Sequence, residues 1–471
     1  MAVPALAVVG QPNKGKSSVV ATLAEDEAIL ISPTPGTTRS AREYAFRVDD
    51  EVHFRLIDTP GFQRAAAVLA WLNEVTVSAN ERPDRVRAFV EAHASNPRFV
   101  DECELLQPIV DGAGIIYVVD GAKPYGAEYE IEMQILRFTG QPRMALINTI
   151  GPGRFVDDWR RAMDQYFSVV RVFDAAEASF PQRLELLHAF GTVHEGWAED
   201  LRATVTAMTG ERTRRRANAA REVADALSDM LTLSVARSVE ESSSADGPRA
   251  AMLIELQNKL RQREAEARHR VEEIYWHAGA ERIESEMPVM TDDLFAERTW
   301  ALFGLTRRQL AATGAMSGAA VGSGVDLAVG GTSFLLGAGI GAAVGAASAL
   351  FGGRMVGRKR VLGRTLGGST ATVGPIRAAA FPWVVLGRAW AHHQIVSERN
   401  HSKRDAIQID LASADALWSR APDALRRALA RVIGRLRSRW GGPQHRAELA
   451  ELISELFEPD GPADAHAPAQ D

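Results

Sequence analysis

The sequence is poor in cysteine and carries little excess charge of either sign. Cys103 is the only cysteine among 471 residues, which excludes an internal disulfide and a cysteine-rich metal site. Lys plus Arg (54) and Asp plus Glu (60) leave a formal charge of −6, which argues against a chain that coats nucleic acid along its length. The first residues lack a basic leader before an apolar core, so we expect no signal peptide and a cytoplasmic protein.

The length predicts two or three domains, because 471 residues exceed one ordinary core. Short apolar runs such as "ALAVV", "VHFRLID", "GIIYVVD" and "RMALIN" alternate with helical stretches. This pattern predicts an α/β domain at 1–195, with a mostly parallel sheet and a helical insertion at about 62–112. We expect an all-α domain at 196–458, whose long helices are split near 242–248, and a disordered tail at 459–471.

The stretch "GQPNKGKS" matches the P-loop pattern between a predicted strand and a predicted helix. The glycines let backbone N–H groups turn toward phosphate oxygens, and the helix N-terminus adds its positive end. Lys16 should bridge the β- and γ-phosphates, and Ser17 should bind Mg²⁺. The predicted nucleotide-binding residues are Gly10, Asn13, Lys14, Gly15, Lys16, Ser17, Ser18 and Asn148.

Two further motifs follow the P-loop in the expected order. "PTPGTTRS" offers Thr38, which should reach Mg²⁺ and the γ-phosphate, and "RLIDTPGF" offers Asp58 as a second Mg²⁺ ligand. The N–H of Gly61 should sense the γ-phosphate. We therefore assign catalysis to Lys16, Thr38 and Gly61, and Mg²⁺ binding to Ser17, Thr38 and Asp58.

These three motifs resemble those of the bacterial Era and TrmE class of P-loop GTPases over roughly residues 1–190. The resemblance implies a GTPase that converts GTP to GDP and phosphate. In that class a hydrophobic residue, here Phe62, stands where Ras-like proteins carry a water-orienting glutamine, and a phenyl ring cannot orient water by hydrogen bonding. The resemblance further implies that Asn13 binds K⁺, so we expect slow, K⁺-assisted hydrolysis.

The base-recognition motif departs from this class. The class reads guanine with Asn-Lys-x-Asp, whereas this chain has "NTIG", which keeps Asn148 but places Thr149 and Gly151 at the lysine and aspartate positions. The strongest discrimination of guanine from adenine is therefore missing. Asp157, Asp158 or the backbone of "FDAA" (173–176) remain candidates to contact the base, and the choice between guanine and adenine stays open.

A run of small and apolar residues at 314–353 has Asp326 as its only charge. Glycines recur every fourth residue, at 314, 318 and 322 and again at 337, 341 and 345, as in closely packed membrane helices. With basic flanks on both sides, residues 310–353 predict a helical hairpin in or on the inner membrane, with a buried hairpin of a soluble domain as the alternative. The helix ending in Trp440 has arginines around an apolar stripe, which suits a lipid surface or ordinary packing equally.

The C-terminal half also resembles uncharacterised bacterial GTPases that carry a C-terminal domain of unknown function. We predict a nucleotide switch that controls a membrane-associated helical domain. One alternative is a ribosome- or tRNA-associated GTPase that uses Arg214–Arg216, although such charge runs are more often solvated helix faces. Another is a nucleotide-binding scaffold with little turnover. Partners to be considered are GTP and GDP, membrane lipid, ribosomal RNA and a second copy of the chain.

Overall fold

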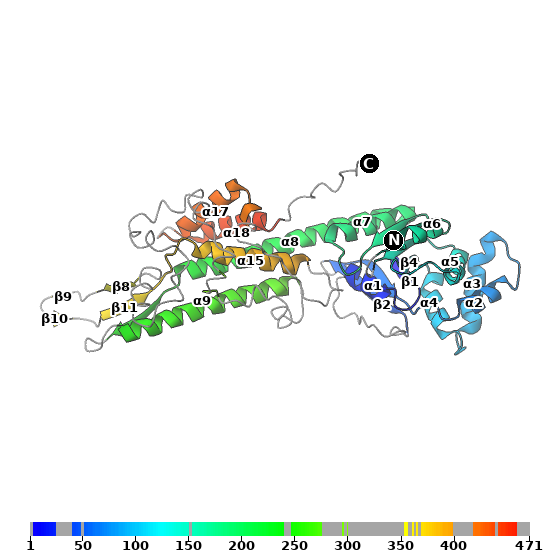
Figure 1. Cartoon of the computed structure of the whole chain (residues 1–471), viewed down its shortest axis with the longest axis horizontal. Coiled ribbons are helices and arrows are strands. Elements are labelled where there is room, and N and C mark those ends of the chain that lie inside the picture. The colour runs from blue at the N-terminus through cyan, green and yellow to red at the C-terminus, as the bar shows by residue number, and fades with distance from the viewer. Residues whose placement is uncertain are drawn as a thin grey trace. The chain divides into compact units, whose positions relative to one another are not determined.

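The computed structural model describes residues 3–24, 40–48, 51–149, 153–239, 246–275, 294–295, 299, 353–356, 360–361, 364–365, 369–398, 418–438 and 441–458. The chain divides into two compact units, residues 1–212 with 398–404 and residues 213–397 with 405–471. The division falls within the long helix α8 (Ala198–Thr232), just after the boundary proposed at residue 195 (Figure 1).

The first unit contains a six-stranded sheet, and its strand order is β2-β3-β1-β4-β5-β6. All neighbouring strands are parallel except β2 and β3, which form an antiparallel pair. The predicted mostly parallel α/β architecture is thus confirmed. The strands are β1 (Ala5–Val9), β2 (Arg42–Val48), β3 (Glu51–Asp58), β4 (Gly114–Asp120), β5 (Arg143–Asn148) and β6 (Val170–Phe173).

Helices cover both faces of this sheet, because alternate residues of the central strands enter two separate cores. Ala7 of β1 and Tyr117 of β4 belong to one core, while Leu6 and Val118 belong to the other. Every residue of β4 is buried, as expected for a central parallel strand. The helices are α1 (Lys16–Ala24), α2 (Ala65–Asn73), α3 (Arg82–His93), α4 (Val100–Val110), α5 (Ala127–Phe138), α6 (Val156–Met163) and α7 (Phe180–Val193).

The helices α2, α3 and α4 occupy the region between β3 and β4 where a helical insertion is predicted. Trp71 of α2 meets Phe89 of α3 edge to face, with 5.4 Å between ring centroids. Phe89 in turn packs edge to face on Phe99, 5.3 Å away, at the residue before α4. Such aromatic pairs stabilise packing beyond the area they bury, so the three helices share a small core.

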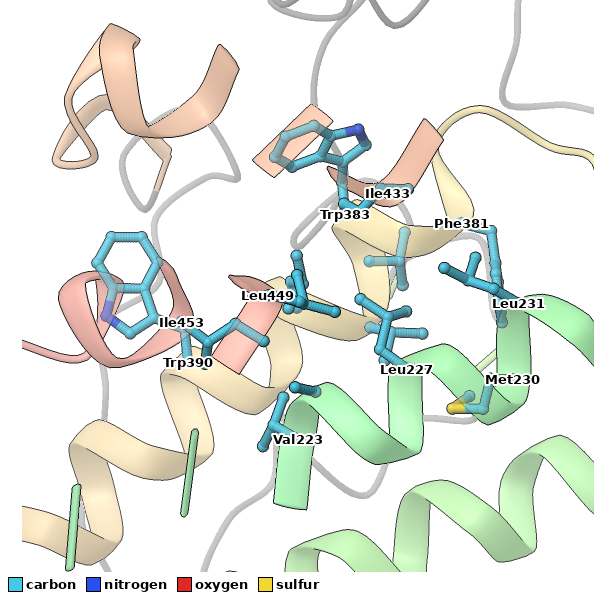
Figure 2. Packing of buried hydrophobic residues seen from close by; sticks show 14 of the residues in the cluster. Val223, Leu227, Met230, Leu231, Phe381, Trp383, Trp390, Ile433, Leu449 and Ile453 are labelled. Carbon is cyan, nitrogen blue, oxygen red and sulfur yellow. The ribbon is translucent and has the colours of Figure 1, made fainter. Parts of the chain in front are cut away.

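The second unit is mainly helical, as predicted, and its core joins helices that are far apart in the sequence. Leu227 and Leu231 of α8 lie against Phe381 of α15 (Phe381–Glu398), and Leu449 of α18 (Pro443–Leu456) is close by (Figure 2). α9 (Asp246–Ile274) runs antiparallel to α8, because Arg263 pairs with Glu222 and Asp229 while Arg270 pairs with Glu222.

A small antiparallel sheet accompanies these helices, and the sequence reading did not anticipate it. β11 (Ser369–Val373) lies between β7 (Val235–Val239) and β8 (Gly353–Val356). β7 stands between α8 and α9, close to the break predicted at 242–248. β9 (Arg360–Val361) and β10 (Arg364–Thr365) pair with each other in the basic stretch that follows the glycine-rich run.

The arginine-rich helix predicted near the C-terminus is α17 (Asp423–Leu436), and it is a packing helix. Leu425, Leu429 and Val432 of its apolar stripe are buried in the core of the second unit. The stripe is therefore covered by the protein itself, which leaves no apolar face of α17 for a lipid surface. Trp440 lies outside the described residues.

The predicted glycine-rich hairpin falls almost wholly outside the described residues, which resume at Gly353 in β8. The predicted tail at 459–471 is also outside them. Within the described part of the chain, no helix is both long and apolar enough to cross a bilayer.

Replacing Leu429 with alanine should lower the free energy of unfolding by about 3 kcal/mol, because it leaves a cavity in the core of the second unit. The measurement is urea unfolding of the full chain, followed by tryptophan fluorescence. Arg431→Ala on the exposed side of α17 is the matched control and should change stability by less than about 0.5 kcal/mol. Equal, small effects of the two variants would mean that α17 does not pack as described.

Candidate nucleotide-binding site

The P-loop lies between the carboxyl end of β1 and the first turn of α1, and its backbone is tightly bent. Gly10 has φ +139°, and a Cβ there would lie 2.3 Å from the carbonyl oxygen of Val118 in β4. Gly15 has φ +85°, which also favours glycine. Asn13 has φ +60°, a conformation that asparagine tolerates better than most residues. These residues therefore lie in the strand–loop–helix context that the motif predicts.

Ser17 and Asp58 come together across the site. The Ser17 hydroxyl in the first turn of α1 donates a 2.8 Å hydrogen bond to Oδ2 of Asp58 at the end of β3. Asp58 is only 3% exposed, so its carboxylate is held in place by the surrounding sheet. A hydroxyl beside a carboxylate is the kind of oxygen donor set that Mg²⁺ prefers, so these residues fit the predicted metal.

Lys16 begins α1, and its ammonium group lies inside the loop. Its Nζ donates a 3.1 Å hydrogen bond to the carbonyl oxygen of Gln11. Burial lowers the pKa of Lys16 to about 8, although the nearby Asp58 and Glu132 carboxylates oppose this shift. A buried lysine that is bound to one carbonyl oxygen and lies near two carboxylates is suited to exchange the carbonyl for phosphate oxygens.

A buried acid beneath the P-loop was missed by the sequence reading. Glu132 of α5 is 2% exposed, and its Oε2 accepts a 2.8 Å hydrogen bond from the Tyr117 hydroxyl. Burial raises the pKa of Glu132 to about 7, against hydrogen bonds from Tyr117 and Gln11 and the charges of Lys16 and Lys14. The sequence does contain one sign that Glu132 is buried. It lies on the same helical face of 127–138 as Tyr129, Met133 and Leu136, which are all buried.

Lys14 belongs to the same buried group. Its side chain is almost covered, with Nζ 5.7 Å from the centroid of the Tyr129 ring. Burial lowers the pKa of Lys14, while Asp120 and Glu132 oppose the shift. Two lysines of the P-loop and the buried acid Glu132 therefore lie close together at the loop that would hold the phosphates.

Gly61 lies directly against the P-loop. A Cβ on Gly61 would stand 2.5 Å from Cδ of Pro12, so the segment has room only for glycine here. The next residue, Phe62, is 5% exposed and belongs to the core with α2 and α4. Its ring serves packing, which agrees with the absence of a water-orienting side chain at this position. Ser18 follows Ser17 in α1, whereas Thr38 falls in 25–39, outside the described residues.

Asn148 holds two loops together. Its Nδ2 donates to the carbonyl oxygen of Lys14 at 3.1 Å, and its Oδ1 accepts from the N–H of Ala175 at 3.1 Å. Thr149 donates a 3.3 Å hydrogen bond to Asp174, whose other oxygen accepts from the N–H of Ala176 and Glu177. The "FDAA" loop is thus fixed beside the P-loop.

Asp157, Asp158 and the position of the missing aspartate are not part of this fixed loop. Asp157 and Asp158 are exposed in the first turn of α6, where Asp158 pairs with Arg161. Gly151, at the position of the missing aspartate, is outside the described residues. The contact that would read the base therefore stays a prediction.

The arginine run proposed for RNA is partly engaged within the protein. Arg215 is 9% exposed, and Arg216 pairs with Glu458 at 3.1 Å. Both arginines therefore have roles in the second unit's own packing, which reduces the charge that the run offers to a phosphate backbone.

Two family models match the chain, and together they cover both of its parts. Residues 5–149 match the model described as 50S ribosome-binding GTPase, and residues 160–458 match the domain of unknown function DUF3482. The chain belongs to the DUF3482 family. Its N-terminal part is a P-loop GTPase domain, so the resemblance to Era-type GTPases is confirmed at the level of the domain. The more specific likeness to the tRNA-modification GTPase stays a prediction.

Curated relatives of this DUF3482 protein match a small part of the chain. GTPase Der of Desulfitobacterium hafniense (strain DSM 10664 / DCB-2) is 42% identical over 77 residues, 16% of this chain and 17% of the relative. GTPase Der of Thermoanaerobacter sp. (strain X514) is 34% identical over 119 residues, 24% of this chain and 27% of the relative. The chain thus spans about a fifth of the length of these relatives.

Solved structures of Era are also similar. Era in complex with MgGDPNP and nucleotides 1506–1542 of 16S ribosomal RNA is 20% identical, with a TM-score of 0.28, over 40% of this chain and 56% of that one. An Era variant of Aquifex aeolicus bound to GDP and AlF4⁻ is 17% identical, with a TM-score of 0.28, over 58% of this chain and 90% of that one.

Because Glu132 is a buried acid, we expect the affinity for GDP to depend on pH, and we expect Glu132→Gln to remove that part of the dependence. As pH rises through about 7, Glu132 becomes charged beside Lys16 and adds negative charge under the phosphate site. Wild-type affinity for GDP should then fall relative to the variant. The two affinities should agree near pH 6 and differ by about tenfold near pH 8, which is about 1.4 kcal/mol.

Titration calorimetry across this pH range measures the ratio of affinities, which cancels the titration of the nucleotide's own phosphate. Glu128→Gln, an exposed acid on the same helix, is the matched control and should show little pH-dependent difference. A constant ratio between wild type and Glu132→Gln from pH 6 to pH 8 would contradict the role given to Glu132.

Proposed function

We propose that this protein binds GTP at the P-loop with Mg²⁺ and hydrolyses it slowly to GDP and phosphate. The observation that carries the proposal is the 2.8 Å contact between Ser17 and Asp58 beside Lys16 at the start of α1. It joins the P-loop to the end of β3, where the chain's second phosphate-sensing motif begins. The contact places a hydroxyl and a buried carboxylate together beside the P-loop lysine, where Mg²⁺ would need oxygen ligands.

Each residue has a role in the proposed reaction. Water attacks the γ-phosphorus, the bond to the β–γ bridging oxygen breaks, and GDP leaves with that electron pair. Lys16 holds phosphate oxygens, while Ser17, Thr38 and Asp58 would hold Mg²⁺, which neutralises phosphate charge when bound. The N–H of Gly61 would donate to the γ-phosphate. No water-orienting side chain is assigned at Phe62, which supports slow turnover.

The reaction would operate as a switch. Thr38 and Gly61 contact the γ-phosphate only while it is present, so hydrolysis would release both segments. The helical DUF3482 region would respond to that change in the GTPase domain. We retain 1–195 as the GTPase domain, with its insertion at 62–112, and 196–458 as the responding region.

Lys16→Ala should weaken GTP binding by at least about a hundredfold, because it removes the charge that faces the phosphates.

The wild type should prefer GTP to ATP by a smaller factor than proteins with a complete base-recognition motif, since Gly151 replaces the aspartate. Fluorescent-nucleotide titration with GTP and ATP measures both quantities. Equal affinity of wild type and Lys16→Ala for GTP would contradict binding at the P-loop.

We also propose that Asn13 binds K⁺ during hydrolysis. Its left-handed backbone places an amide side chain within the P-loop three residues before Lys16. Exchange of Na⁺ for K⁺ should raise kcat at least about tenfold in the wild type. Asn13→Gly removes the amide without straining the backbone, so it should abolish this stimulation. Identical turnover of the wild type in both salts would rule out the K⁺ role.

The cellular partner stays a prediction. Membrane association through 310–353 would be contradicted if salt-washed membranes lack the protein. Binding to ribosomal RNA through Arg214–Arg216 would require salt-sensitive co-sedimentation with ribosomes. Self-association through either part of the chain is tested by sedimentation of the nucleotide-bound protein.

A further inference from the structure

Two acidic side chains of α4 bind backbone N–H groups next to the segments that should sense the γ-phosphate. Oε1 of Glu102 accepts hydrogen bonds from the N–H of Gln63 at 3.0 Å and from the N–H of Arg64 at 2.5 Å. Oε2 of Glu104 accepts from the N–H of Ala41 at 3.0 Å, three residues beyond Thr38. One helix of the insertion therefore contacts the chain at Gln63 and Arg64, after β3, and at Ala41, before β2.

The contact made by Glu102 is buried and charged. Glu102 is 1% exposed, so water competes little for its carboxylate. The N–H groups it accepts lie at the start of α2, where Arg64 occupies the N-cap position without a capping side-chain hydrogen bond. A carboxylate at a helix N-terminus stabilises the unpaired N–H groups there. Glu102 thus supplies from α4 the cap that α2 does not supply for itself.

The segment that Glu102 holds is short and is fixed at both ends. Gly61 lies against Pro12 of the P-loop, and Phe62 is anchored in the core. The next two residues are the ones bound by Glu102. Glu102 therefore fixes the C-terminal end of a segment that begins beside the phosphate site.

α4 is itself a rigid support. Cys103, Leu105, Leu106 and Ile109 are buried in the core of the first unit. α4 packs against α3 and β1, and through Phe99 it joins the aromatic core of the insertion. The position of Glu102 is thus set by the whole insertion and by the strand that leads into the P-loop.

We propose that Glu102 is a positioning residue for GTP recognition, and that Glu104 assists it at the segment before β2. Glu102 fixes 61–64 so that the Gly61 N–H is oriented toward the γ-phosphate before nucleotide binds. This inference rests on the proposed GTP-binding function. It also gives the insertion at 62–112 a specific role, which is to hold the segment 61–64 in place against the P-loop.

The test compares the affinities of Glu102→Ala for GDP and for a non-hydrolysable GTP analogue in the full chain. We expect the analogue to bind about tenfold more weakly than to wild type, with GDP affinity within about twofold, since only the γ-phosphate reaches Gly61. The kcat for GTP should fall in parallel. Glu104→Ala should show a smaller loss in the same direction.

Asp101→Ala is the matched control, because Asp101 lies in the same first turn of α4 without a described hydrogen bond to either segment. It should leave both affinities unchanged. Glu102→Gln keeps an acceptor oxygen but loses the charge, so its loss of analogue affinity should be about threefold. If Glu102→Ala fails to fold, this second variant decides the question by the same ratio.

Three results separate the possible failures. Equal weakening of GDP and the analogue in the Glu102 variants would mean that Glu102 only stabilises the fold. An unchanged or higher analogue affinity would overturn the inference directly. Failure of the wild type to bind either nucleotide would instead contradict the proposed function.

Discussion

The close approach of the P-loop to the central strands controls the geometry of the site. Gly10 leaves no room for a side chain beside Val118, and Gly61 leaves none beside Pro12. The loop is thereby held between β4 on one side and the segment after β3 on the other. The contact of Ser17 with Asp58 and the inward position of Lys16 both depend on that placement. A displaced loop would lose both features together.

The buried charges around this loop distinguish the site from a simple phosphate cradle. Lys14, Lys16 and Glu132 lie where water competes weakly, so each charge affects the others strongly. Glu102 and Glu104 of α4 also hold the backbone N–H groups of Gln63, Arg64 and Ala41. The insertion thus contributes structure to the nucleotide site as well as bulk to the domain.

Much of the first unit could be predicted from its motifs, since the P-loop and the strand patterns are local in sequence. The roles of Glu132 and Glu102 could not be predicted from the sequence, because the residues they bind lie on other strands and loops. The small sheet of the second unit was missed for the same reason: β7 and β11 pair Val235 with Val373 across a long stretch of chain. The apolar stripe of α17 predicted an amphipathic helix correctly, but the surface that covers it comes from distant helices.

The most direct measurement is hydrogen–deuterium exchange of the full chain without nucleotide, with GDP and with a non-hydrolysable GTP analogue. The analogue, compared with GDP, should slow exchange in peptides covering 59–64 and 100–110. Binding of the analogue without any change at 59–64 or in α4 would contradict the claim that the γ-phosphate is sensed through a segment held by the insertion.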